Sequence, residues 1–435
     1  MKQVITAKLK LNTPPEQRKL LRETQLAYRD ALNYVSEWSF ANGKTSNQDK
    51  LQQACYDAIR ERFGLPAQMA CNILRMVGST YKGLWTKVKQ NAAARKAGFT
   101  KKRYKGLDKA PKFVSPVITY NIGRDYSFKT ENRVSVNTLN GRAIVGYEGY
   151  SKHVELIHHG SKIGAAKLWY DKPRKQFYLL VSLEIERPDA QPSDHKQAVG
   201  VDVGRRYLAV ATNAKDETMF FPGKKIVHKA NHYARLTKRL QQKGTRSAKR
   251  RLQTISGRER RLKLDANHVV SKRIIERYSS SMIGIEELTG IRERTKRKGG
   301  KQATKPQRKA NAVQSKWAFA ELHALIAYKA TLAGSMVLKV DANNTSKGCP
   351  CCGHVSAQNR PGKGLLFHCE NCGYRLHADL VGARNLALRT LLIRQDWMRT
   401  GALSLRPDGS DKEAKAVRLQ RYAELRWSPD PSQRL

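Results

Sequence analysis

Acidic residues are scarce in this sequence. Of its 435 residues, 36 are Asp or Glu and 83 are Lys or Arg, which leaves a formal net charge of +47. A positive excess of this size requires a polyanionic partner, because self-repulsion otherwise opposes the compact state. Hydrophobic residues make up 40% of the chain, which excludes disorder along its whole length. The length predicts about two to four domains of about 100–200 residues each.

Long apolar runs are absent as well. No stretch approaches the ~18 uninterrupted apolar residues of a membrane-spanning helix, and residues 1–11 lack the apolar run of a signal peptide. We therefore expect a soluble cytoplasmic protein with no membrane partner.

Cysteine is rare and unevenly spread. The chain has 7 cysteines, an odd number, and five of them fall between residues 349 and 372. This distribution excludes a disulfide framework spread over the fold and indicates a metal site instead. Cys55 and Cys71 lie in a helical pattern at helical spacing from apolar residues, so we expect them to be part of a core.

The clustered cysteines have the spacing C-x2-C-x16-C-x2-C, which is typical of a four-thiolate zinc ribbon. The predicted zinc ligands are Cys349, Cys352, Cys369 and Cys372. Each pair is followed by glycine, which suits a tight knuckle around the metal. We expect Cys351, His354 and His368 to lie outside the ligand set, because four thiolates complete a structural site.

The N-terminal half changes from a β pattern to a helical pattern and back. Residues 1–11 alternate as a strand does, and 13–95 form a helical block that begins with a capping box and a proline at its first helical position. Residues 113–187 are rich in short β patterns, with a strand at 177–186 paired with 167–170. We predict a small β-barrel or sandwich, followed by a polar linker at 187–194.

The second half mixes strands and helices. Strands are expected at 199–204, 207–212, 281–286 and 337–340, and helices at 265–278, 315–334 and 380–394. Residues 229–263 hold 13 Lys or Arg and one acid, and 291–309 hold nine Lys or Arg, one acid and a Gly-Gly pair. The second basic run is predicted to be a mobile loop, and the weakly periodic residues 401–435 to be disordered.

Three acids differ from this basic background. Asp202 lies within an apolar strand, where an unpaired buried charge is costly, Glu286 ends a second strand, and Asp379 opens a helix. Taken singly, each has a structural explanation, since Asp379 could cap its helix and Glu286 could be a solvated strand end. Together they suit phosphodiester hydrolysis, which commonly uses two divalent ions about 4 Å apart that are held by clustered carboxylates.

Five motifs follow one another between residues 199 and 394. They are GVDVG at 200–204, IEEL at 285–288, TSKGCxxCG at 345–353, CxxCG at 369–373, and Asp379 followed by Ala383 and Asn385. In this order they resemble the RuvC nuclease domain of the TnpB (OrfB) family. Proteins of that family are encoded by bacterial insertion sequences and are similar to the miniature type V CRISPR effectors.

The resemblance implies an α+β multidomain fold. An RNase H-like α/β RuvC domain with a zinc-ribbon insertion would follow a β-barrel wedge domain that carries an α-helical recognition insert. The expected boundaries are 1–12 and 96–190 for the wedge, 13–95 for the recognition domain, 196–344 and 375–397 for the nuclease, 345–374 for the ribbon, and 398–435 for a disordered tail.

The resemblance also implies an activity, that of an RNA-guided DNA endonuclease. A transposon-derived guide RNA would pair with target DNA, the protein would recognise a short motif beside the target, and the RuvC site would cut. Guide RNA and target DNA are therefore the expected partners, with one protein per guide RNA, in the cytoplasm and at the nucleoid when bound to DNA. Neutralising the phosphates of an RNA and of a heteroduplex accounts for the charge of +47.

Carried over to this sequence, the resemblance makes Asp202, Glu286 and Asp379 the catalytic residues and the ligands of Mg²⁺ or Mn²⁺, while the four cysteines hold structural Zn²⁺. Glu287 is the second choice for the middle acid. Two departures are visible: residues 381–383 are Val-Gly-Ala where the family usually has Asn-Ala-Ala, and Cys351 is additional. Neither departure removes a ligand.

Other classes of protein fit less well. A nuclease-dead or weakly active RNA-guided DNA-binding protein is expected to lose at least one acid, and all three are present. A cut-and-paste transposase uses similar acids, but a ribbon so near the third acid favours the TnpB type. A basic zinc-ribbon protein of RNA structure leaves the spaced acids unexplained. A miniature type V CRISPR effector stays open, and the genomic neighbourhood, a repeat array or transposon ends, would decide.

Overall fold

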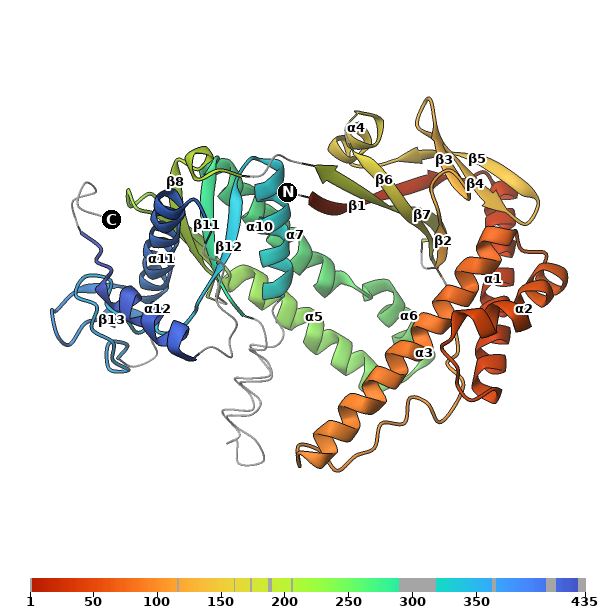
Figure 1. The fold of residues 1–435 in the computed structure, drawn as a ribbon, viewed down its shortest axis with the longest axis horizontal. Helices are drawn as coiled ribbons and strands as arrows, with labels where there is room; N and C mark the ends of the chain where they lie inside the picture. The colour runs from red at the N-terminus through yellow and green to blue at the C-terminus, as the bar shows by residue number, and fades with distance from the viewer. Residues whose placement is uncertain are drawn as a thin grey trace. The chain divides into compact units, whose positions relative to one another are not determined.

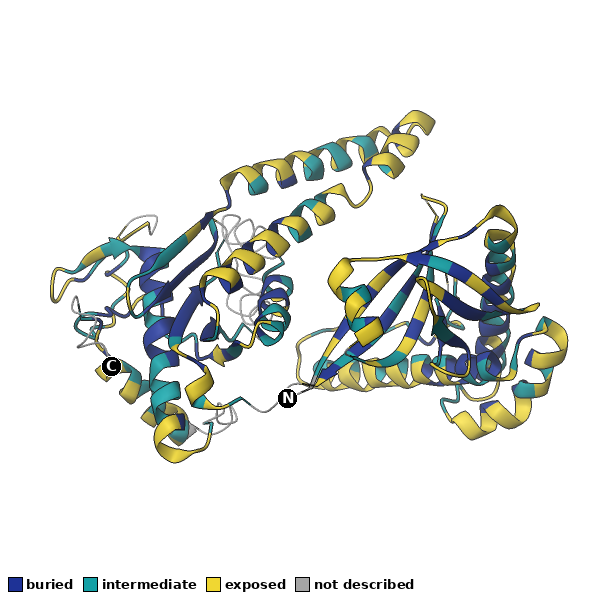
Figure 2. Cartoon of the chain, turned by 90° about the horizontal axis from the view of Figure 1, so that it is seen from above, coloured by how far each residue is buried: buried dark blue, intermediate teal, exposed yellow. Residues whose placement is uncertain are grey.

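The structure is a computed structural model of the chain (Figure 1). It describes residues 2–115, 117–159, 161–172, 174–186, 190–204, 206–288, 318–361, 365–403 and 412–428. The chain forms two compact units, Met1–Arg187 and Pro188–Leu435. In each unit the buried residues are concentrated on the strands and on the helices packed against them (Figure 2). Within the described ranges, no helix combines the length and apolarity needed to cross a membrane.

The first unit is built on a seven-stranded antiparallel sheet in the order β2-β6-β7-β1-β5-β4-β3. Its strands are β1 (Lys2–Asn12), β2 (Ile118–Tyr120), β3 (Tyr126–Lys129), β4 (Arg133–Thr138), β5 (Gly141–Glu148), β6 (Lys162–Asp171) and β7 (Gln176–Glu186). The N-terminal strand β1 lies in the middle, between β7 and β5. Strand β7 buries every second residue from Phe177 to Ile185, so the predicted alternation is confirmed, as is its pairing with residues 167–170 of β6.

Three helices are inserted between β1 and β2: α1 (Pro15–Ala41), α2 (Gln48–Phe63) and α3 (Ala67–Lys96). A proline begins α1, as predicted, but it is Pro15, one residue later than a capping box of Thr13 and Glu16 implies. The predicted capping box is wrong, because Pro14 occupies the N-cap and no side chain caps the helix. Helix α2 is capped by the side chain of Asn47. Cys55 is fully buried in this block, while Cys71 is only partly buried. A short helix, α4 (Ser151–His159), interrupts the region for which only strands were expected.

The second unit contains a five-stranded mixed sheet in the order β10-β9-β8-β11-β12. Its strands are β8 (Gln197–Asp202), β9 (Tyr207–Asn213), β10 (Thr218–Pro222), β11 (Ser281–Glu286) and β12 (Met336–Val340). Strand β11 runs parallel to β8 and β12, and β9 runs antiparallel to β8 and β10. A two-stranded ribbon of β13 (Leu366–His368) and β14 (Arg375–His377) follows along the chain.

Helices cover both faces of this sheet. The helices of the unit are α5 (Lys224–Lys243), α6 (Arg246–Ile255), α7 (Arg258–Arg277), α10 (Phe319–Leu332), α11 (Ala378–Thr400) and α12 (Lys412–Glu424). Side chains of α7 and α10 pack with Val201 and Ile285 on one face, and Leu386 of α11 packs with Met282 on the other. Alternate residues of β8 and β11 therefore point to opposite helices.

Helix α11 approaches its face of the sheet very closely at two glycines. Gly200 of β8 and Gly284 of β11 are direct partners in the parallel register. A Cβ atom added to Gly200 would overlap backbone atoms of Ala383 and Ala387, and one added to Gly284 would overlap the hydroxyl of Thr390. Only glycine at these positions allows α11 to lie this close to both strands.

The expectation of a disordered tail at 398–435 is wrong where helices are found, at residues 398–400 and 412–424. Residues 398–400 complete α11, and α12 follows at Lys412–Glu424. After α12, Leu425 and Trp427 are buried against Ala387 and Leu388 of α11. Two apolar residues in an irregular segment give no periodicity, which is why the sequence did not indicate this packing. The predicted basic loop at 291–309 lies outside the described residues.

Candidate metal centres

Two of the three predicted acids lie at the ends of adjacent parallel strands. Strand β8 ends at Asp202 and β11 ends at Glu286, and the register pairs Val201 with Ile285. Paired residues of neighbouring strands point to the same face, so both acids lie on the face of Gly200 and Gly284, which α11 covers. The parallel register therefore brings together two carboxylates that are 84 residues apart in the sequence.

The third acid comes from α11 itself. Asp379 is in the first turn of this helix, and its backbone N–H donates to Nδ1 of His377 at 3.2 Å. One turn further along, Gly382 faces Asp202: a Cβ atom added there would lie 3.1 Å from Cγ of Asp202. Glycine at this position leaves space for the Asp202 carboxylate against α11.

Burial and mutual repulsion shape the charge state of Asp202. Burial raises the pKa of its carboxyl well above the usual value, and the negative charges of Glu286 and Asp379 raise it further. The positive charge of Arg360 opposes this shift, and its guanidinium lies 4.0 Å from the Asp379 carboxylate. The three acids therefore interact electrostatically at a partly buried place, where a bound cation would stabilise all three ionised forms.

Glu286 is held by its own partners. Thr345 donates its hydroxyl hydrogen to Oε1 of Glu286 at 2.8 Å. Burial raises the pKa of Glu286, while this hydrogen bond and the positive charge of Arg389 lower it. Arg389 is buried in α11 and donates to the backbone carbonyls of Asp341 and Asn343. Thr345, which lies in the segment after β12, thus fixes the orientation of the Glu286 carboxylate.

Glu287 points away from this cluster. Its carboxylate lies 3.8 Å from the ammonium of Lys339, and its negative charge acts on His323 of α10. Helix α10 packs on the face of the sheet opposite α11. The structure therefore places Glu286, and not Glu287, beside Asp202.

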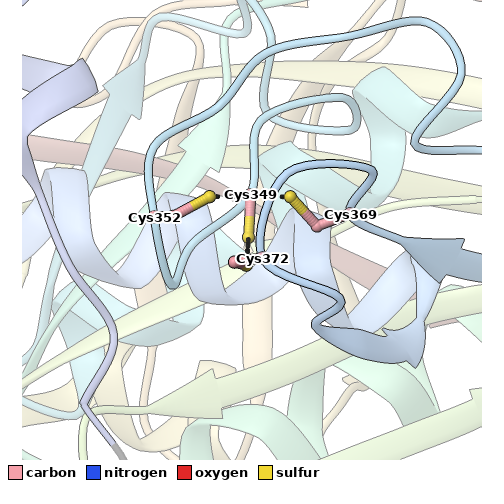
Figure 3. Close-up of side chains that lie close together, drawn as sticks. All are labelled: Cys349, Cys352, Cys369 and Cys372. Atoms are coloured by element: carbon pink, nitrogen blue, oxygen red, sulfur yellow. Dashed lines mark hydrogen bonds between the residues drawn. The ribbon is translucent and has the colours of Figure 1, made fainter.

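The four predicted thiols converge at one point (Figure 3). The sulfur atoms of Cys349 and Cys372 lie 3.7 Å apart, those of Cys352 and Cys369 lie 3.5 Å apart, and all four lie within 4.8 Å of one another. A tetrahedral zinc ion with Zn–S bonds of about 2.3 Å requires S–S separations of about 3.8 Å. The geometry fits four thiolates around one ion.

The two cysteine pairs have matching backbone conformations. Gly353 N–H donates to Cys349 O, and Gly373 N–H donates to Cys369 O, both at 2.9 Å. Both glycines have positive φ, at 76° and 73°, a conformation that favours glycine. The glycine after each pair is therefore required by the turn that places the second thiol of the pair.

The flanking residues lie outside the thiol group, as expected. Nε2 of His354 lies 2.9 Å from Oε1 of Glu370, and Cys351 packs beside the core that contains Phe367. Burial alone would raise the pKa of Cys352, but hydrogen bonds from the His354 backbone and the Asn371 side chain contribute to lowering it to about 6. The thiolate form of this cysteine is therefore favoured near neutral pH.

The two centres differ in compactness. The ligand atoms of the four cysteines all lie within 4.8 Å of one another. Among the described residues, no other set of three or more potential metal ligands is found this close together. The three acids share one face and interact electrostatically but do not form a group that compact.

The thiol centre is joined to the acids through α11. The Asn385 amide donates to Thr345 O at 2.7 Å and to Gly348 O at 2.9 Å. Thr345 in turn donates to Glu286. These hydrogen bonds connect Glu286 to the first cysteine knuckle, and Asn385 holds the connecting segment to the helix that carries Asp379.

Two families match parts of the chain. Residues 180–290 match the family described as "Probable transposase" (OrfB_IS605), and residues 319–386 match "Cas12f1-like, TNB domain". The resemblance to the TnpB (OrfB) family is confirmed. The transposase match includes Asp202 and Glu286, and the TNB match includes Asp379 and all four clustered cysteines.

Curated relatives of this TnpB-like chain carry CRISPR names. It is 26% identical over 250 residues to the "CRISPR-associated endodeoxyribonuclease Cas12f1" of Sulfoacidibacillus thermotolerans, with 52% of this chain and 53% of the relative covered. It is 27% identical over 233 residues to the Cas12f2 of a Micrarchaeota archaeon, with 50% and 40% covered. The chain thus matches about half the length of these curated relatives.

Among solved structures, similarity extends to the "Cryo-EM structure of the Cas12f1-sgRNA-target DNA complex". The sequence identity is 16% and the TM-score is 0.49, with 85% of this chain and 81% of that chain covered.

Two residues with evident contacts at the acids were not assigned a role from the sequence. Thr345 belongs to a motif noted there, but its hydrogen bond to Glu286 depends on the path of the chain after β12. Arg389 lies in the predicted helix, and a buried arginine has no periodic signal. Arg389 follows Asn385 by one helical turn, so the two residues share a face of α11. This spacing is the signal that could have identified Arg389.

Proposed function

We propose that this chain is an RNA-guided DNA endonuclease encoded by an insertion sequence. The observation that carries the proposal is the meeting of the partly buried Asp202, Glu286 and Asp379 between the sheet and α11, where the carboxylates of Glu286 and Asp379 raise the cost of ionising Asp202. The curated relatives are named endodeoxyribonucleases, which supports the reaction class. In this proposal the second unit is a RuvC nuclease domain with a zinc ribbon, and the first is a wedge domain with a helical recognition insert.

The three acids would hold Mg²⁺ or Mn²⁺, and the four thiolates would hold Zn²⁺. Carboxylate oxygens suit the former and sulfur suits the latter. The divalent ions would supply an activated water and stabilisation of the leaving oxygen. Thr345 keeps the Glu286 carboxylate in one orientation, and Arg389 supplies positive charge behind it. The chain's own residues thus fix the ligand geometry before any substrate binds.

Guide RNA and target DNA are the proposed partners. The net charge of +47 suits phosphate neutralisation. Its distribution adds to this: helices α5 and α6 carry 11 Lys or Arg between Lys224 and Arg251 with no acid. They bury three residues, Ala230, Ala248 and Ile255. A helical surface of this kind presents cations to a nucleic-acid backbone.

The test begins with the RNA that co-purifies with the protein. Its sequence defines a target, which is placed in a DNA library beside a randomised segment, and cleavage is measured under single-turnover conditions. Cleaved products should share a short motif beside the target. EDTA should stop cleavage, and Mg²⁺ or Mn²⁺ should restore it. Protein that retains its RNA but cuts no library member would contradict the proposal.

Matched variants assign the middle acid. Glu286→Gln should lower the cleavage rate by about 100-fold or more, because removal of one preorganised electrostatic group from an active site commonly costs 10²–10³. Glu287→Gln removes the neighbouring carboxylate, which faces Lys339 on the other side of the sheet, and should leave the rate within about twofold of wild type. Asp202→Asn and Asp379→Asn should behave as Glu286→Gln does.

A second candidate, a miniature type V CRISPR effector, is favoured by the names of the curated relatives. The chemistry is the same, and the origin of the guide differs. A co-purifying RNA transcribed from a repeat array would establish this candidate, and one transcribed from a transposon end would establish the insertion-sequence nuclease.

A further inference from the structure

An aromatic cluster lies next to the acids and takes no part in the functions assigned above. Tyr207, Phe220 and His377 meet edge to face, with ring centroids 5.1 Å apart for Tyr207–Phe220 and Tyr207–His377 and 5.4 Å apart for Phe220–His377. The three rings come from β9, from β10 and from the N-cap of α11. Phe220 is 39% exposed, so one ring of the cluster is open to solvent.

The sheet register fixes the position of this ring relative to Asp202. Phe220 pairs with Val210, and Val210 pairs with Asp202. The three residues therefore form one row across β10, β9 and β8, on the face that α11 covers. Strands are about 4.8 Å apart, so the Cα atoms of Phe220 and Asp202 are separated by roughly 10 Å.

The same cluster is tied to Asp379 from the other side. His377 contacts both aromatic rings, and its Nδ1 accepts the backbone N–H of Asp379 at 3.2 Å. Between the cluster and Asp202, Val210 packs against Leu380 and Ala383 of α11. The exposed ring is thus held by a rigid layer that also carries two of the three acids.

Basic residues surround the cluster in the sequence. Arg206 precedes Tyr207, Lys224 and Lys225 follow Phe220, and Arg375 precedes His377, and all four are exposed. The Gly223 N–H donates to Arg206 O at 2.7 Å, which brings the start of β9 next to the start of α5. An apolar ring with cations around it suits a ligand that has both a planar apolar face and a phosphate.

Resting on the proposed nuclease function, we propose that Phe220, supported by Tyr207 and His377, is a stacking platform for an unpaired nucleobase of the DNA strand that is cut. Aromatic side chains bind single-stranded DNA by stacking on bases with little sequence preference. Bases in a duplex are already stacked, so the platform serves an unpaired strand. The separation of roughly 10 Å corresponds to about three stacked nucleotides from the phosphate at the acids. Phe220 is a positioning residue, because it acts on the strand and not on the reacting atoms.

The first experiment measures single-turnover cleavage by the protein with its co-purified RNA. Phe220→Ala should slow cleavage by about 5- to 150-fold, the range expected for the loss of one base–aromatic stack. Phe220→Trp should retain most of the rate, since it keeps a stacking surface. The matched control is Met398→Ala, which removes an exposed apolar side chain (55% exposed) near the other end of α11 and should leave the rate unchanged. Equal zinc content and thermal unfolding of the variants exclude a folding defect.

The second experiment identifies the base. Abasic sites are placed one at a time within five nucleotides of the cut. At one position the abasic substrate should slow the wild type as much as Phe220→Ala does, and the variant should show no further loss there. A merely structural role would give additive losses at every position, which would overturn the proposal, as would a wild-type rate for Phe220→Ala.

The third experiment separates this inference from the nuclease proposal. In protein that carries Asp202→Asn, 2-aminopurine at the identified position, or at each scanned position if no cleavage occurs, should be quenched on binding. Adding Phe220→Ala should restore its fluorescence. Quenching that depends on Phe220 without any cleavage by the wild type would support the platform and refute the nuclease. Fluorescence that is insensitive to Phe220 in a cutting enzyme would refute the platform alone.

Discussion

Replacing Gly200 by alanine should impair the second unit in two separable ways. The new methyl group would overlap the backbone of Ala383 and Ala387, and a helix backbone cannot move aside as a flexible side chain can. Overpacking of this kind typically costs about 1–3 kcal/mol. For a unit of 248 residues, 188–435, each kcal/mol lowers the melting temperature by about 2–4 °C. The expected decrease is therefore about 2–12 °C.

The effect of Gly200→Ala on cleavage should exceed its effect on stability. Helix α11 carries Asp379, so the displacement that accommodates the methyl group moves one proposed metal ligand away from Asp202 and Glu286. A misplacement of about 1 Å at a catalytic group can lower the rate by about 100-fold. Cleavage at a temperature well below the transition should thus fall strongly while the protein remains folded.

Gly83→Ala provides the matched control. Gly83 lies inside α3, and an added Cβ atom there meets nothing within 4 Å. Alanine is favoured over glycine in a helix interior by about 1 kcal/mol, so this variant should melt at the same temperature or slightly higher. Calorimetry and single-turnover cleavage check both variants side by side. If Gly200→Ala melts and cuts like Gly83→Ala, the close packing of α11 on β8 does not position Asp379.

Three further predictions concern other parts of the molecule. Cys369→Ser should lose the zinc that elemental analysis detects, and it should cut more slowly because the ribbon contacts α11. Cys351→Ser should keep one zinc per chain. Equal zinc content in the two variants would contradict the ligand set. Burial lowers the pKa of His323 to about 4. The folded state therefore binds fewer protons than the unfolded state between pH 4 and 6.5, and stability should be complete above about pH 6.5 and fall by up to about 3 kcal/mol as the pH drops to 4. Urea unfolding should show that His323→Leu reduces this loss, and an unchanged pH profile would show that the residue is not the cause. Trp427→Ala should lower the free energy of unfolding of the second unit by about 3 kcal/mol. The reason is that Trp427 packs on Ala387 and Leu388 and its ring lies 4.8 Å from the Arg384 guanidinium. A loss below about 0.5 kcal/mol would mean that the segment after α12 does not pack on α11 in solution.

Much of the second unit could be predicted because its signals are local. The apolar run that ends at Glu286 defines β11 with both boundaries correct, and the cysteine spacing together with the following glycines predicts the two knuckles. The choice between Glu286 and Glu287 needed the structure, because adjacent strand residues face opposite sides and the sequence does not say which side α11 covers.

Other features depend on contacts that no sequence pattern contains. The capping box at Thr13 failed because the adjacent prolines satisfy the start of α1 without a side-chain cap. Thr345 reaches Glu286 through the path of the chain after β12, and the charge of Arg389 acts on Glu286 from α11. The aromatic cluster combines residues 207, 220 and 377, and their proximity follows from the strand order and not from spacing.

The central position of β1 determines when the protein becomes complete during its synthesis. Strand β1 pairs along most of its length with β7, which is translated more than 170 residues later. At about 5–20 residues per second, the first strand waits on the order of ten to thirty seconds on the ribosome for its partner. The helices α1–α3 emerge in that interval and can pack with one another first.

The three acids are also synthesised at different times. Asp202 emerges soon after the first unit is finished, but Asp379 and the glycine-packed helix α11 come 177 residues later. A nascent chain therefore acquires its first unit well before it acquires a complete set of carboxylates. Translation that stops anywhere between residues 203 and 378 releases a chain with a whole first unit and no means of completing the acid cluster.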